Sequence, residues 1–180
     1  MVDHRVAEVA ETNVSQGVSE RGLALLWIAV AAAVALHNAE EWLLGMTGWI
    51  AEHPWLPVAS LHGDQDQFAL VLTLVTAAVL ALTVTALTLR PRWSVEVLVC
   101  AGYVIMANGI SHLLLSLLSW SPMPGVFSGT AVLLPLGVIL TRALPPVRWT
   151  VVGVAMTAVA GVGIIAGGFV VAALLSRWTG

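Results

Sequence analysis

The sequence predicts an all-α fold: an integral membrane helical bundle of five transmembrane helices. The 180 residues are 59% hydrophobic and only 9% charged, a balance that would leave much of the core of a soluble domain exposed. Apolar stretches recur at the length of about 20 residues that crosses roughly 30 Å of hydrocarbon. Polar or proline-containing links separate them. We expect spans at residues 22–45, 68–89, 93–118, 125–143 and 149–175.

The chain divides into a polar N-terminal tail, residues 1–20, and a single transmembrane helical domain, residues 21–180. The first span should remain as an anchor, because its apolar run is too long for a signal peptide and no small-residue cleavage pattern follows it. The net charge of −3 and the lack of a basic run give no indication of a nucleic acid partner. The expected surroundings are membrane lipid.

The arginines predict the topology. All seven basic residues are arginines, and only Arg177 falls on the far side of the membrane. The positive-inside rule therefore places the N-terminus in the cytoplasm and the C-terminus outside, in the plasma membrane of the cell. The six on the cytoplasmic side are Arg5, Arg21, Arg90, Arg92, Arg142 and Arg148.

The links between spans differ in length. The outer loop, residues 46–67, contains two tryptophans and two prolines, so it either lies back over the outer mouth of the bundle or forms an interfacial loop in which Asp64 or Asp66 caps the second helix. The later links are short, which predicts that consecutive spans lie side by side and antiparallel.

The fifth span carries Gly153, Thr157 and Gly161 at four-residue spacing. Small residues are enriched where helices pack closely in lipid. This glycine-rich face either packs within the chain or forms a homodimer contact.

The first and third spans hold the residues that suggest chemistry. An ionisable group near the centre of a membrane helix costs about 2.5 to 3.5 kcal/mol, so it needs a function or a partner. His37, Glu40 and Glu41 lie in the first span, and at about 100° per residue both carboxylates flank the imidazole. Asn108 and His112 lie one turn apart in the third span.

Depth in the membrane connects these two groups. At about 1.5 Å per residue, His37 and His112 lie roughly 24 Å and 28 Å from the cytoplasmic ends of their helices. Since lipid offers polar groups no partner, the two faces should turn toward each other. The fourth span begins at this depth with Pro124-Gly125, and its N-terminal dipole is available to an anionic group.

These motifs resemble a known family. His37-Asn38-Ala39-Glu40-Glu41 is similar to the signature of the HXXEE family of integral membrane proteins, and Asn108-x-x-x-His112 followed by Pro124-Gly125 resembles its second signature. The resemblance covers about residues 30 to 140. It implies a membrane location and a shared polar site, without an established activity.

The leading functional hypothesis is a metal-dependent enzyme embedded in the membrane, of the hydrolase, lyase or isomerase class. His37, Glu41 and His112 would bind a divalent ion such as Zn²⁺ or Fe²⁺, and His62 would add a further imidazole if the outer loop folds inward. Glu40 or Glu41 would act as the base and Asn108 as a polar clamp. The substrate would be lipidic or amphipathic.

The same residues are also compatible with other functions. Without metal, one of the two adjacent carboxylates would serve as a general base, an arrangement similar in kind to the Abi/CAAX-type intramembrane proteases, although no arginine follows Glu41 within the span. A small ion or proton-coupled transporter would use the same residues for ion transit. A polar network could also only fix the helix register. Haem between His37 and His112 is the least favoured cofactor, because carboxylates would be unusual beside the iron.

Overall fold

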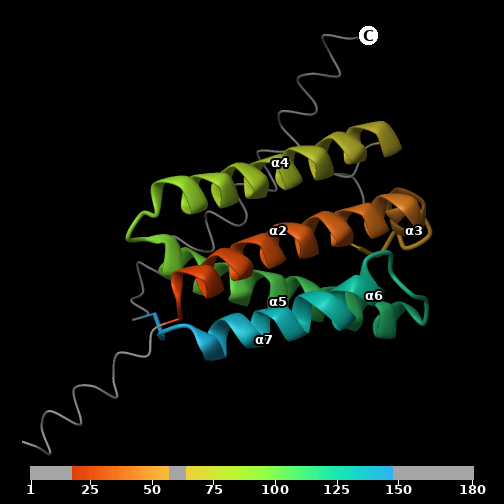
Figure 1. The fold of residues 1–180 in the computed structure, drawn as a ribbon. Coiled ribbons are helices and arrows are strands. Elements are labelled where there is room, and N and C mark those ends of the chain that lie inside the picture. Colours follow the sequence, from red (N-terminus) through yellow and green to blue (C-terminus); the bar gives the residue numbers. More distant parts are fainter. Residues whose placement is uncertain (1–17, 57–63, 148–180) are drawn as a thin grey trace, which may run out of the picture.

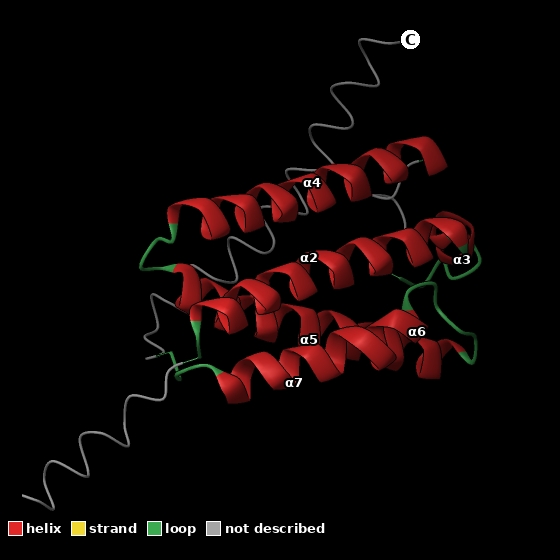
Figure 2. Ribbon diagram, in the orientation of Figure 1, coloured by secondary structure: helices red, strands yellow, loops and turns green. Residues whose placement is uncertain are grey.

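The computed structural model describes residues 18–56 and 64–147, and the regular structure within these ranges is helical throughout (Figure 2). The predicted all-α class is therefore confirmed for the described part of the chain. The elements in order are α2 (Glu20–Leu43), α3 (Met46–Ala51), α4 (Gln65–Leu89), α5 (Ser94–Ser119), α6 (Val126–Ser128), the π-helical turn η2 (Gly129–Leu133) and α7 (Leu134–Ala143).

Within the described residues, four helices are long and apolar enough to cross a membrane, as in a membrane protein. They are α2, α4, α5 and the continuous helix formed by α6, η2 and α7. These four correspond to the first four predicted spans, although α4 begins three residues earlier than expected. The predicted fifth span and most of the predicted N-terminal tail lie outside the described residues, as does His62.

Local sequence determines the helix ends. The Asp64 side chain accepts a hydrogen bond from the backbone N–H of Gln67 at 2.8 Å, which confirms the predicted cap of the second long helix. Arg90 and Trp120 adopt left-handed backbone conformations and end α4 and α5. Pro135 lacks an N–H and crowds the carbonyl one turn earlier, so the wider turn of η2 directly before it relieves this conflict.

The helices pack as two pairs, α2 with α4 and α5 with α7, and α2 also contacts α5 (Figure 1). The short link between α4 and α5 predicted that these two helices would lie side by side as antiparallel neighbours. That expectation is wrong, because the main contacts of α4 are with α2. In the second pair, glycines let α5 approach the π-helical turn that precedes α7: a Cβ on Gly109 of α5 would lie 2.5 Å from the Gly129 carbonyl oxygen of η2.

The outer loop begins with α3, which folds back onto the ends of the long helices (Figure 1). Met46 and Trp49 of α3 are buried against Phe68 of α4 and Met123 of the α5–α6 link. The Trp49 Nε1–H donates to Ser121 Oγ at 3.1 Å. This part of the loop therefore lies back over the bundle, as one of the two sequence interpretations proposed.

Candidate metal centre

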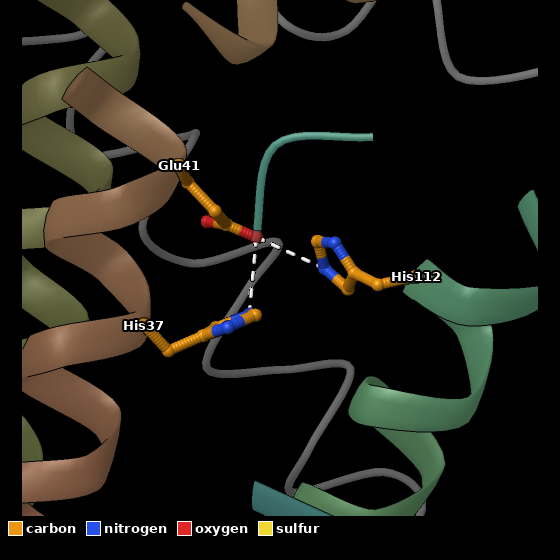
Figure 3. A group of neighbouring side chains, drawn as sticks. All are labelled: His37, Glu41 and His112. Carbon is orange, nitrogen blue, oxygen red and sulfur yellow. Dashed lines mark ion pairs between the residues drawn. The ribbon is translucent and has the colours of Figure 1, made fainter. Parts of the chain in front are cut away.

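Three ionisable side chains meet between α2 and α5 (Figure 3). One carboxylate oxygen of Glu41, Oε1, lies 3.3 Å from His37 Nε2 and 3.1 Å from His112 Nε2. His37 and His112 are only 2% and 3% exposed, and Glu41 is 8% exposed. The predicted convergence of the two motifs is therefore present, with a single carboxylate between two imidazoles.

The backbone before α6 determines the tautomer of His112. Its Nδ1 lies 2.8 Å from the Pro124 carbonyl oxygen, which can only accept, so Nδ1 carries the proton. In the neutral imidazole, Nε2 then presents a lone pair. That lone pair points at the Glu41 oxygen.

The imidazole of His37 is oriented in the same way, with Nδ1 toward a partner outside the cluster and Nε2 toward Glu41. Its Nδ1 lies 2.9 Å from Ser128 Oγ, and the Asn108 amide nitrogen donates to its Nε2 at 2.9 Å. Ser128 directs its own hydroxyl toward the Gly125 carbonyl at 3.5 Å, which leaves its oxygen free to accept from His37. Both imidazoles thus hold Nδ1–H against a partner and turn Nε2 toward Glu41.

Three electron-rich atoms consequently face one another in a buried place. With both imidazoles neutral, the Asn108 N–H covers the His37 lone pair, whereas the His112 lone pair and the Glu41 oxygen repel each other unless a proton or a cation lies between them. Burial leaves few water molecules to reduce that repulsion. The described cations are arginines at the opposite ends of the helices, beginning with Arg21 and ending with Arg142, so no cationic side chain of the described residues supplies the missing charge.

The donor set fits a divalent metal ion. With ligand bonds of about 2.0 to 2.2 Å, ligand atoms around a tetrahedral ion lie about 3.4 Å apart. The two distances to Glu41 are close to this, and all three ligand atoms lie within 4.8 Å of one another. Histidines that bind metals usually donate their other ring N–H to a carbonyl or hydroxyl, as both do here.

The same geometry excludes haem between the two histidines. Their ring centroids lie only 4.7 Å apart, with the ring planes at 82°. A porphyrin between two axial imidazoles needs rings on opposite sides of its plane, and this spacing leaves no room for one.

Glu40, the other glutamate of the motif, takes a different place. Its carboxylate accepts hydrogen bonds from the backbone N–H groups of Gly125, Phe127 and Ser128, at 3.1, 3.1 and 2.7 Å. The anionic group that the N-terminus of the fourth long helix was expected to attract is therefore a side chain of α2. Glu40 is not among the three residues whose ligand atoms converge.

A glycine permits the close approach of the turn to the site. Gly125 has φ +90°, and a Cβ there would lie 2.7 to 2.8 Å from atoms of both His112 and His37. Only glycine fits both the backbone conformation and the space.

Four predicted site residues come together: His37, Glu41, Asn108 and His112. The sequence interpretation did not assign Pro124 and Ser128, which hold the two imidazoles, to the site. The signals in the sequence were their position at the start of the fourth span, level with the two histidines, and, for Pro124, its place in the second family signature.

The described part of the chain also has a cavity of about 490 Å³ between α2 and α4. It is lined mostly by small residues, with Asn38 and Thr76 among them, and none of the three converging residues lines it. The Asn38 amide donates to Thr76 Oγ1 at 2.8 Å and so joins the two helices. The cavity and the cluster therefore occupy different faces of α2.

The comparisons with known proteins agree with the motifs. A family model described as a protein of unknown function with an HXXEE motif matches residues 27–140. The match runs from α2 into α7 and includes every residue of the candidate centre. The searches of curated proteins and of solved structures found no match. Since the matched segment makes up more than half of the chain, the protein belongs to this HXXEE-motif family.

Proposed function

We propose that this protein is a membrane-embedded metal protein in which His37, Glu41 and His112 hold one divalent ion. One observation carries the proposal: the Nδ1–H of His112 is committed to the Pro124 carbonyl, so its Nε2 lone pair meets the Glu41 carboxylate at 3.1 Å. Such a contact requires a positive species. Zn²⁺ and Fe²⁺ accept mixed imidazole and carboxylate ligands.

We further propose that the centre is catalytic and acts on a lipidic or amphipathic substrate. Two histidines and one glutamate are the protein ligands of a common type of catalytic zinc site, in which a position stays open. A bound ion would supply Lewis acidity and a means of activating water. A hydrolase, lyase or isomerase reaction is consistent with this donor set.

The residues of this chain would then have distinct roles. Pro124 and Ser128 fix the ring orientation of the two histidines. The Asn108 amide donates to His37 Nε2, the atom that would bind the ion, so a bound ion would displace this hydrogen bond and leave the amide able to donate to an oxygen of the substrate. Burial of the three ligand residues limits access by bulk water.

The metal content of the purified protein tests this proposal. Protein prepared in detergent without added metal should contain close to one divalent ion per chain. Glu41→Gln and His112→Ala should lower the affinity by more than about 100-fold, since each removes a direct ligand. Matched controls are Glu96→Gln, an exposed glutamate at the far end of α5, and His53→Ala, a histidine just after α3 whose ring stacks on Trp49.

Two outcomes would contradict the proposal. One is wild-type protein that binds neither Zn²⁺ nor Fe²⁺ more tightly than His112→Ala does, which would favour a proton shared by Glu41 and the histidines. The other is metal lost equally in the His53→Ala control. For the catalytic part, amphipathic esters and amides would be screened with metal-loaded protein, and turnover unaffected by His112→Ala would contradict it.

The proposed topology completes this account. We propose five spans, with residues 149–175 as the fifth, in the plasma membrane and with a cytoplasmic N-terminus, so that the centre lies toward the outer leaflet. The arginine distribution supports this orientation. A cysteine introduced at Ser176 should react with an impermeant reagent from outside, and one at Ser15 should not. The reverse labelling pattern would invert the topology.

A further inference from the structure

Glu40 makes an unusual set of hydrogen bonds for a glutamate in an apolar helix. Both of its carboxylate oxygens accept from backbone N–H groups: Oε1 from Gly125 and Phe127, and Oε2 from Ser128. These donors are the otherwise unpaired N–H groups at the start of the fourth long helix, where the helix dipole also favours negative charge. One side chain of α2 thus binds three backbone N–H groups at the start of that helix.

The segment held by Glu40 supplies the partners of both histidines. The Pro124 carbonyl fixes His112, and the Ser128 hydroxyl fixes His37. These two groups are four residues apart, on either side of Gly125. Any movement of this turn relative to α2 would therefore disturb both imidazoles at once.

We infer that Glu40 is a positioning residue that assembles the metal centre by fixing residues 124–128 against α2; this inference rests on the proposed metal function. The two adjacent glutamates have different roles. Glu41 faces the histidines, and Glu40, 100° further round the helix, faces the backbone that orients them.

The chemistry of the contact requires a carboxylate of this length. Three N–H donors need acceptors only, and an ionised carboxylate offers two acceptor oxygens. A glutamine would turn its NH₂ group toward at least one backbone N–H. An aspartate keeps the charge but is one methylene shorter, so it would draw the turn toward α2 or lose part of the contact.

Metal affinity and cobalt spectroscopy would test the inference. Glu40→Gln should still bind one ion, about 10 to 100-fold more weakly than the wild type, as expected when partners of the ligands are disturbed. The visible absorption of the Co²⁺-substituted protein should change shape, because the imidazoles are no longer fixed. Glu40→Asp should fall between the wild type and Glu40→Gln, and it provides a second variant if Glu40→Gln does not fold. Glu96→Gln should match the wild type in both measurements.

Two results would overturn the inference. If Glu40→Gln and Glu40→Asp keep wild-type affinity and spectrum, Glu40 does not position the site. If Glu40→Gln folds but loses the ion as completely as Glu41→Gln, Glu40 is itself a ligand.

Nitrogen NMR of the histidine side chains separates this inference from the proposed function. In metal-free wild-type protein, Nδ1 of both His37 and His112 should carry a proton. Glu40→Gln should shift the ring signals of both residues but not that of His53. If the wild type binds no metal, the proposed function fails, and these NMR shifts alone decide the role of Glu40. Unchanged ring signals in Glu40→Gln would then contradict it.

Discussion

The two ends of the bundle bury polar groups in different ways. At the Trp27 end, defined by Trp27, Ser94, Leu98 and Leu140, the Trp27 Nε1–H donates to Ser94 Oγ at 2.7 Å within an apolar cluster. Donor and acceptor match, and both side chains are neutral. At the His112 end, defined by His37, Glu41 and His112, two imidazoles and a carboxylate meet through acceptor atoms.

This difference separates structural from functional burial. A buried polar pair that is neutral and complete costs little and fixes one packing arrangement. A buried carboxylate that faces an imidazole lone pair costs free energy unless a proton or an ion lies between the two atoms. The Trp27 end therefore contributes to stability alone. At the His112 end, binding of a positive ion would remove the repulsion between the buried side chains.

The largest expected effect compares one core residue with one ligand. Leu98 is fully buried at the Trp27 end, so Leu98→Ala should destabilise the protein by about 2 to 5 kcal/mol, through lost contacts and a new cavity. Its metal affinity should stay within a factor of about two of the wild type. Glu41→Gln should show the opposite: a melting temperature no more than a few degrees lower, with metal binding lost, since removal of a buried charge offsets the lost contacts.

Thermal melting in detergent and metal titration of the same samples would check this pair. The comparison between the two ends would break if Glu41→Gln unfolds while Leu98→Ala does not. It would also break if both variants lose stability and metal binding together.

A smaller effect should come from the glycines with positive φ. Gly125→Ala and Gly45→Ala both place a side chain in the left-handed region, at a cost of about 1 to 2 kcal/mol. Only Gly125→Ala also drives a Cβ against His37 and His112, whereas a Cβ at Gly45 has no atom within 4 Å. We therefore expect Gly125→Ala to melt at a lower temperature than Gly45→Ala, and only Gly125→Ala to lose metal affinity. Equal affinities in the two variants would show that the turn does not form the wall of the centre.

The smallest effect on the metal centre should come from Ser94→Ala at the Trp27 end. It leaves the buried Trp27 N–H without its partner and should cost about 1 to 3 kcal/mol. Metal content and the Co²⁺ spectrum should not change. A spectral change would mean that the two ends are coupled through α2, and the distinction between them would need revision.

Much of this fold follows from local sequence features. Long apolar runs and the proline-containing links predict the helices, and Asp64 predicts the start of α4. Packing partners are less local: the short link at residues 90–93 indicated α4 beside α5, but α4 packs mainly on α2, where Asn38 bonds to Thr76. A link fixes only how far apart two helix ends lie, and side-chain contacts along the whole helix decide the neighbour.

The candidate site was predictable to a similar degree. Helical spacing and equal depth predicted that His37, Glu41, Asn108 and His112 converge, because lipid cannot satisfy them. The different orientations of Glu40 and Glu41 were not predictable, since an angle of 100° on one helix does not say which neighbour each side chain meets. The roles of the Pro124 carbonyl and the Gly125 backbone depend on the turn conformation, which residue types alone do not specify.

X-ray absorption at the metal edge tests the central claim most directly. Wild-type protein loaded with one equivalent of Zn²⁺ should show nitrogen and oxygen scatterers at about 2.0 to 2.2 Å, with the outer-shell pattern of two imidazoles. His112→Ala protein, loaded in excess, should show at most one imidazole. A spectrum from the wild type with no imidazole contribution, or one that His112→Ala leaves unchanged, would contradict the metal centre proposed for His37, Glu41 and His112.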